Sequence, residues 1–177
     1  MKKFSKMFAF ILVMVLSCLF IVACSNSDDD DDENESLSVW TSIDSYDENN
    51  VKCVDTYTLT LYSSSFTLAL KMEENNKVVI DSKVLEGNYI NSADGKITFK
   101  TTKAARALVL TEEELNEKAE KEAANFSDEA SFVLFWLNYC FEVVDANEKV
   151  PDTIGVLKDG KLIWTDTDGE EMVFIKN

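Results

Sequence analysis

The sequence predicts a mainly β domain of the α+β class, in which an antiparallel meander carries an inserted helical segment. Apolar and polar residues alternate through much of the segment from 37 to 102, which is typical of strands with one buried face. Asp-Gly pairs suited to tight hairpin turns occur at Asp94-Gly95, Asp159-Gly160 and Asp168-Gly169. Between residues 104 and 145 the apolar spacing changes to that of helices, which indicates the insertion.

Residues 1–23 have the pattern of a secretory signal peptide. Three lysines up to Lys6 precede an apolar stretch from Met7 to Ala23, and Cys24 follows directly. The run Ile21-Val22-Ala23-Cys24 resembles the lipobox of bacterial lipoproteins. That resemblance implies cleavage before Cys24 and attachment of lipid, including an acyl chain such as palmitate, to this residue. A plain signal peptide or an uncleaved anchor is the alternative, because about 17 apolar residues are just enough to span a bilayer.

Residues 24–36 are predicted to form a lipidated, acidic tether. Acids run without a break from Asp28 to Glu33, so the segment should repel itself and stay extended in water. The run also resembles an acidic surface-export signal of some bacterial lipoproteins, and Cys24 is followed by Ser25 rather than by aspartate. By this resemblance we expect a protein of the bacterial envelope, lipid-anchored at the outer membrane, with exposure at the cell surface as a further alternative.

The remaining residues, 37–177, are expected to form one β-rich domain. Its first hairpin joins two alternating segments through Ser63-Ser64-Ser65. Their apolar positions are Tyr57, Leu59 and Leu61 before this link, and Phe66, Leu68, Leu70 and Met72 after it. Asn75-Asn76 then predicts a turn into a strand over 77–85, and Gly87 is expected at a bulge or a sharp bend.

Two helices are predicted near residues 111–145. Thr111 and Glu114 form a capping box, which marks the start of the first helix. Ser127-Asp128-Glu129 marks the start of the second, for which a strand is the alternative because nearly every following residue is apolar. Its shared apolar face would hold Phe132, Phe135, Trp136, Tyr139 and Val143. We interpret the aromatic cluster of this segment as core that covers the sheet, with a lid over an apolar cavity as the alternative; its members are Phe132, Phe135, Trp136, Tyr139 and Phe141.

Three short strands are expected after Pro151, the only proline. They are placed at 154–157, 162–165 and 172–175 and are joined by the last two Asp-Gly turns. The acids around Asp166 do not complete a calcium loop, because Trp164 stands where the pattern requires an acid. No metal site is therefore predicted.

The composition excludes several classes of function. The net charge is −16 at pH 7 and becomes −19 if the three leader lysines are removed, so binding to nucleic acid through phosphate neutralisation is not expected. Histidine is absent, which removes Ser-His-Asp and Cys-His catalysis as well as histidine-based zinc sites. We therefore predict that the protein is not an enzyme and uses no cofactor.

Cys53 and Cys140 are the two cysteines of the folded domain and form a candidate disulfide. Disulfides persist outside the cytosol, and a bond that closes so long a loop would contribute about 4–5 kcal/mol by the chain-entropy model. The alternative is a pair of buried thiols that pack as small apolar side chains.

The order of several short motifs resembles that of the small lipocalin-like lipoproteins of bacteria. Trp40 comes early, Gly87-Asn88-Tyr89 precedes Asp94-Gly95 and Ile97-Thr98-Phe99, and Gly160-Lys161-Leu162 lies near the end. The resemblance implies a calycin-type barrel of eight or more strands that can hold one small apolar ligand. A β-sandwich is the alternative architecture, and the inserted helical segment departs from the family pattern.

The predicted function is non-catalytic binding by a lipid-anchored domain. The expected partners are the membrane, through Cys24, and a small hydrophobic ligand. Residues that share the inward faces of the predicted strands would line its cavity, namely Tyr57, Leu59, Phe66, Leu68 and Phe99. The alternative is a structural or protein-interaction module with a filled core and no small-molecule ligand.

Overall fold

The computed structural model describes residues 36–48, 50–147, 149–166 and 169–177. The predicted leader, Cys24 and all of the predicted tether except Ser36 lie outside these residues.

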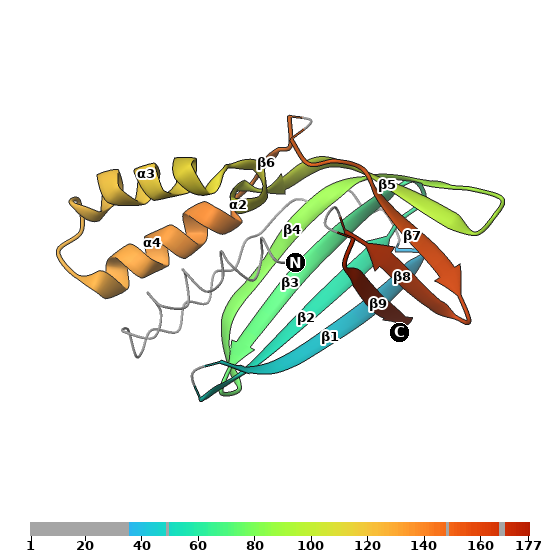
Figure 1. The fold of residues 1–177 in the computed structure, drawn as a ribbon, viewed down its shortest axis with the longest axis horizontal. Coiled ribbons are helices and arrows are strands. Elements are labelled where there is room, and N and C mark those ends of the chain that lie inside the picture. The colour runs from blue at the N-terminus through green and yellow to red at the C-terminus, as the bar shows by residue number, and fades with distance from the viewer. Residues whose placement is uncertain (1–35, 49, 148, 167–168) are drawn as a thin grey trace.

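In the described part of the chain, nine strands form one antiparallel sheet. They are β1 (Ser38–Glu48), β2 (Val51–Leu61), β3 (Ser65–Glu74), β4 (Lys77–Asn91), β5 (Lys96–Ala105), β6 (Val143–Asp145), β7 (Thr153–Lys158), β8 (Lys161–Thr165) and β9 (Glu171–Lys176). The order β4-β3-β2-β1-β9-β8-β7-β5 returns to β4 through the β4–β5 pairing, so eight strands close into a barrel (Figure 1). The prediction of a mainly β, antiparallel fold is confirmed, and the sandwich alternative is wrong because the sheet closes on itself.

Two hairpin turns use residues that tolerate a positive φ angle. Asn75 and Asn76 have φ of 49° and 65°, and Asp159 and Gly160 have φ of 52° and 73°. A type I′ turn requires positive φ at both central residues and matches the twist of the strands that it joins. These turns set the registers of the β3–β4 and β7–β8 hairpins.

Gly87 lies at a bulge between β4 and β5, as predicted from the sequence. A Cβ atom at this position would lie 2.1 Å from the carbonyl oxygen of Lys100, which is backbone and cannot turn aside. The glycine therefore lets the two strands approach closely where the register shifts.

The strands differ in length, and this gives the barrel two unlike ends. β1 and β2 have 11 residues each and β4 has 15, whereas β8 has only 5. At about 3.3 Å per residue, β1 is about 20 Å longer than β8. β9 pairs with β1 only at Trp40 and Thr41. We call the half of the barrel that all eight strands enclose the closed end. The other half, into which only β1–β4 continue, is the extended end (Figure 1).

Aromatic side chains fill the closed end. Phe99 stacks on Trp164 with ring centroids 4.1 Å apart, and Phe66 meets Phe99 edge-on at 5.0 Å. Phe174 packs on the far side of Trp164 at 6.3 Å, and all four side chains are fully buried. A Cβ atom at Gly155 would lie 2.9 Å from Phe99, so even a methyl group lacks space there. The closed end is therefore a packed core.

Three helices in the described residues separate β5 from β6: α2 (Arg106–Val109), α3 (Glu112–Ala123) and α4 (Glu129–Phe141). Thr111 and Glu114 form the capping box of α3, with Glu114 N–H donating to Thr111 Oγ1 at 3.2 Å and Thr111 N–H to Glu114 Oε2 at 2.7 Å. Asp128 caps α4 by accepting from Ser131 N–H at 2.8 Å. The strand alternative for this second segment is therefore wrong.

Val143, which the apolar spacing placed on the second helix, lies on β6 instead. α4 ends at Phe141 because Glu142 takes an extended conformation, and Val143 then pairs with Ala105 on β5. The edge of β5 offers backbone hydrogen bonds to the residues after α4, and these compete with the hydrogen bonds of a further helical turn.

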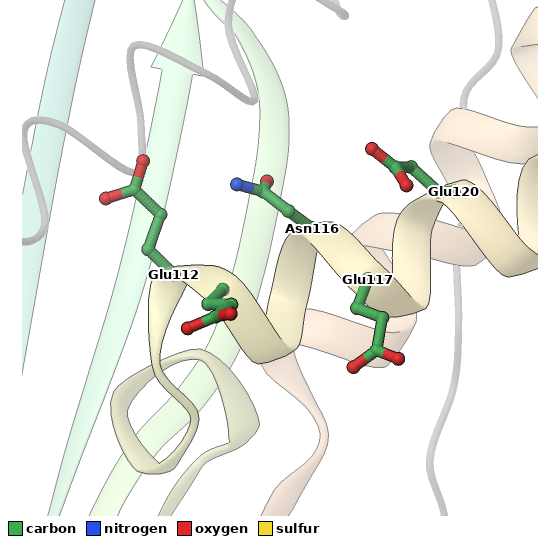
Figure 2. A pocket seen from close by; sticks show the side chains of 5 residues that line it. Glu112, Asn116, Glu117 and Glu120 are labelled. Atoms are coloured by element: carbon green, nitrogen blue, oxygen red, sulfur yellow. The ribbon is translucent and has the colours of Figure 1, made fainter.

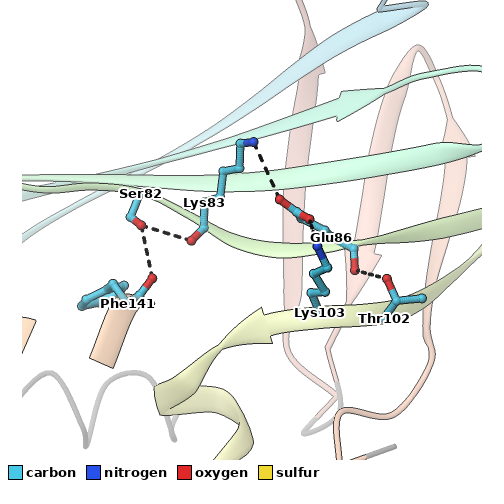
Figure 3. Close-up of polar contacts among 6 residues, drawn as sticks. All are labelled: Ser82, Lys83, Glu86, Thr102, Lys103 and Phe141. Atoms are coloured by element: carbon cyan, nitrogen blue, oxygen red, sulfur yellow. Dashed lines mark hydrogen bonds and ion pairs between the residues drawn. The ribbon is translucent and has the colours of Figure 1, made fainter. Parts of the chain in front are cut away.

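Polar contacts join the C-terminus of α4 to β4 (Figure 3). Ser82 Oγ donates to the carbonyl oxygen of Phe141 at 3.4 Å and lies 3.2 Å from that of Lys83. Glu86 lies 3.7 Å from both Lys83 and Lys103, which links β4 to β5. Phe132, Trp136, Cys140 and Phe141 on α4 are buried, so this helix belongs to the core.

Candidate functional site

The five residues predicted to line a cavity all lie on the inner face of the barrel. They are Tyr57, Leu59, Phe66, Leu68 and Phe99, and none is more than 4% exposed. Leu59 lies opposite Leu68 across the β2–β3 pairing, next to the aromatic core of the closed end. Tyr57 lies further toward the extended end. Four of the five thus belong to the packed core of the closed end, and only Tyr57 reaches toward the extended end.

The inner wall of the extended end carries one buried acid, Asp55. Alternate residues of β2 from Cys53 to Leu61 are buried, so Asp55 points to the same face as Leu59 in the core. Asp55 is 7% exposed and is the only charged residue that is buried in the described part of the chain. The register places it between Asp44 on β1 and Met72 on β3.

One oxygen of the Asp55 carboxyl group lacks a hydrogen-bond partner. Oδ2 accepts from the Tyr46 hydroxyl at 3.4 Å, a long hydrogen bond, while no described residue donates to the buried Oδ1. The pKa of Asp55 is raised to about 6, mainly by burial and also by the charge of Asp44, and the Tyr46 hydrogen bond opposes the rise. An orphaned buried oxygen of this kind needs an explanation, such as a bound group or water.

The groups around Asp55 are acidic or neutral. Burial, together with the charges of the neighbouring acids Glu74 and Glu48, raises the pKa of Cys53 to about 11. Burial and the Glu48 charge also raise the pKa of Glu74. A thiol with so high a pKa is protonated at neutral pH and is a poor nucleophile. Within the described residues, no group of three or more Asp, Glu, Cys or His side chains could hold a metal ion.

The other buried residues of the inner wall at the extended end are largely apolar. Tyr57, Leu70, Met72 and Ile80 are buried there, on β2, β3 and β4. The pairings of Tyr57 with Leu70 and of Met72 with Ile80 bring these side chains together across the strands. The arrangement is an apolar wall with one convergent polar group, which suits the binding of a small amphiphilic molecule.

The candidate disulfide is not formed, and Cys53 and Cys140 are buried free thiols. Cys140 precedes Phe141, which contacts Ser82 on β4, and Ser82 is level with Tyr57 through the β3 residue between them. Cys53 lies four residues from Tyr57, about 13 Å further along β2. A disulfide requires Cα atoms within about 7 Å and Cβ atoms that converge, and the two thiols do not meet in this way.

A shallow hollow on the surface of α3 is lined by acidic side chains (Figure 2). Its lining residues are Glu112, Glu113, Asn116, Glu117 and Glu120. Glu117 forms an ion pair with Lys121 at 2.7 Å, and these side chains are exposed. This hollow is the solvated face of a helix, as the run of acids suggests.

The outer surface of the barrel carries an apolar row that the sequence analysis did not identify. Val156, Ile163 and Val173 lie opposite one another across β7, β8 and β9, and we call them the outer aliphatic row. Ile154 and Ile175 flank it and are about half exposed. The signal in the sequence was that these short strands are apolar on both faces.

Asp55 was also missed, although its position carried a signal. The alternation of Tyr57, Leu59 and Leu61 extends backward to Asp55 and Cys53, which share the inward face. An acid at an inward position of a predicted strand indicates either a functional group or an exposed strand end. The burial of Asp55 is inconsistent with an exposed strand end.

No protein-family model, curated protein or solved structure matches this chain. No helix among the residues described is long and apolar enough to cross a membrane.

Proposed function

We propose that the protein is a lipid-anchored lipoprotein of the bacterial envelope whose lipocalin-like barrel binds a small, largely apolar molecule at its extended end. The observation that carries this proposal is the buried Asp55 carboxyl group, which has an unpaired oxygen on the inner wall of a barrel whose other end is packed. The lipobox resemblance at Cys24 supports the lipid anchor, and the acidic tether would hold the barrel away from the membrane surface.

The energetics of Asp55 favour a bound molecule over a merely structural core. A buried polar atom without a partner costs about 1–3 kcal/mol, and a core selected only for stability would have an apolar residue here. Leu59 and Leu61 on the same face of β2 are such residues. A ligand with a donor group would supply the missing hydrogen bond, and its apolar part would lie among apolar side chains such as the buried Leu70 and Met72.

Binding without catalysis suits the chemistry of this end of the barrel. Asp55 is the acid there with the most deeply buried side chain, and a neutral thiol at Cys53 offers no nucleophile. General acid–base catalysis by a carboxyl group normally uses a second group placed on the reacting atom.

A second candidate function is docking of another protein on the outer aliphatic row. The row combines the exposed Val173 with the partly buried Val156 and Ile163, and with the exposed Ile154 and Ile175 beside it this is a surface that a partner could cover. The packed closed end supports this alternative, because a filled core needs no ligand.

Native mass spectrometry of the full-length lipidated protein, extracted from its host membrane in nanodiscs, tests the first candidate. We expect a bound small molecule in addition to the anchor, which is lost on denaturation. The double variant Val173→Thr/Ile163→Thr is the matched control on the outer face, and it should retain the molecule. A consistent apo mass for both proteins would contradict ligand binding and favour the docking alternative.

A further inference from the structure

We propose that Asp55 recognises a positively charged amine at one end of the ligand, so that the ligand class is a small amphiphilic amine. This inference rests on the proposed function, since it names the kind of molecule that the extended end binds.

The position of Asp55 is the first argument. Its side chain faces the barrel interior, is more than nine-tenths buried, and holds Oδ1 free of any donor from the described residues. The Tyr46 hydroxyl occupies only Oδ2, and only at 3.4 Å. A carboxylate accepts about four hydrogen bonds, so room remains for an ammonium group, which is a donor only.

The second argument is the sign of the surrounding charge. Asp44 lies directly across the β1–β2 pairing from Asp55, and the acids Glu48 and Glu74 lie at the same end of the barrel. No described lysine or arginine is among the groups that act on the Asp55 carboxyl group. A group of charges of one sign raises the local concentration of ligands of the opposite sign and repels anions such as fatty acids.

The third argument is the nature of the neighbouring side chains. Tyr46 contacts Asp55 through its hydroxyl group, and Tyr57 is the next inward residue along β2. Aromatic rings attract cations, and the Coulombic attraction between an ammonium group and a carboxylate is stronger at low dielectric than in water. Met72, opposite Asp55 on β3, and the adjacent Leu70 are buried apolar side chains that form the surroundings of the carboxyl group.

Three six-carbon probes that differ only in their head group test the inference. Hexylamine, hexan-1-ol and hexanoate are titrated into the full-length protein in nanodiscs at pH 7.5 by calorimetry, with empty nanodiscs as the blank. We expect hexylamine to bind at least about tenfold more tightly than hexan-1-ol, and hexanoate to bind more weakly than either.

Asp55→Asn is the informative variant, because it keeps the shape of the side chain and removes its charge. Hexylamine affinity should fall at least about tenfold in Asp55→Asn while hexan-1-ol affinity changes less than about threefold. Asp81→Asn is the matched control, because Asp81 is an exposed acid on the outer face of β4, and its hexylamine affinity should change less than about threefold. Melting temperatures establish that both variants are folded.

The outcomes separate the two proposals. Equal binding of hexylamine by the wild-type protein and Asp55→Asn, or preference for the alcohol, would overturn the amine inference and leave apolar ligand binding intact. Binding of none of the three probes, by a protein that also carries no molecule in native mass spectrometry, would overturn the proposed function itself.

Discussion

At the scale of single residues, Asp55 makes the stability of the fold depend on pH. Its pKa rises from an ordinary 3.8 to about 6 in the folded chain. Between these values the folded state holds a proton that the unfolded state has lost, so stability falls as the pH rises from about 4 to 6 and is constant above. This rise of about two units in the pKa of Asp55 corresponds to roughly 3 kcal/mol of stability lost at neutral pH.

Asp55→Asn should therefore stabilise the protein at pH 7.5. We expect the free energy of unfolding in urea to increase by about 1–3 kcal/mol at pH 7.5 and to change little at pH 4. Asp81→Asn, which replaces an exposed acid on the outer face of β4, should change it by less than about 0.5 kcal/mol. A loss of stability in Asp55→Asn at pH 7.5 would mean that the carboxylate is satisfied by a group that the amide cannot replace.

The two thiols give a second test at this scale. Burial raises the pKa of Cys140 to about 12 and that of Cys53 to about 11, so both should be protonated and slow to react. We expect a thiol reagent at pH 8 to modify neither in the folded protein and both after unfolding in urea. A domain mass two hydrogens short, with no reaction after unfolding, would show a disulfide instead.

At the scale of the elements, α4 distinguishes a core helix from a movable lid. Trp136 is 4% exposed and its ring lies 5.5 Å from that of Tyr139 and 6.2 Å from that of Phe132, whereas Leu134 on the same helix is 37% exposed. The helix therefore contributes to the core through one face only, although it is apolar on almost every side.

Trp136→Ala should lower the free energy of unfolding by about 3–5 kcal/mol, because it removes a large buried side chain and leaves a cavity. Leu134→Ala is the control on the exposed face and should cost less than about 1 kcal/mol. Urea titrations of both variants measure the difference. Similar small losses would indicate that α4 packs loosely and opens as a lid.

At the scale of the whole molecule, the seam between β1 and β9 is the weakest part of the barrel. The two strands pair only at Trp40–Lys176 and Thr41–Ile175, whereas β2 and β3 pair over nine positions. Closure thus depends on few hydrogen bonds between strands that are far apart in the sequence.

Hydrogen exchange should report this seam directly. We expect the amides of β9 to exchange by local opening well before those of β2 and β3, which should exchange only on global unfolding. Mass spectrometry of peptic fragments gives both exchange rates in one experiment, so the β2–β3 hairpin serves as the internal reference. Equal protection of β9 and β3 would mean that the barrel opens only as one unit.

The elements were predictable where neighbouring residues decide them. The Asn75-Asn76 turn, the capping box of Thr111 and Glu114, and the bulge at Gly87 all follow from preferences that act over a few residues. The aromatic residues of the core were also recognisable from their alternation. Val143 was misplaced because its apolar side chain fits either a helix or a strand, and only the edge of β5 decides between them.

The site depended on contacts that the sequence does not display. Phe66, Phe99 and Trp164 come from three distant strands, so only their assembly shows that they fill the closed end rather than line a cavity. Asp55 becomes unusual only when β1 and β3 bury it without giving Oδ1 a donor.

The sequence by itself determined the alternation of strands and turns, the helical insertion and the acidic charge, because each is set by local composition. Only the tertiary structure decided that the sheet closes, that Cys53 and Cys140 stay apart, and that one acid is desolvated on the inner wall. These are properties of strand lengths and of pairings between distant segments, and desolvation depends on everything packed around a group rather than on its neighbours in the chain.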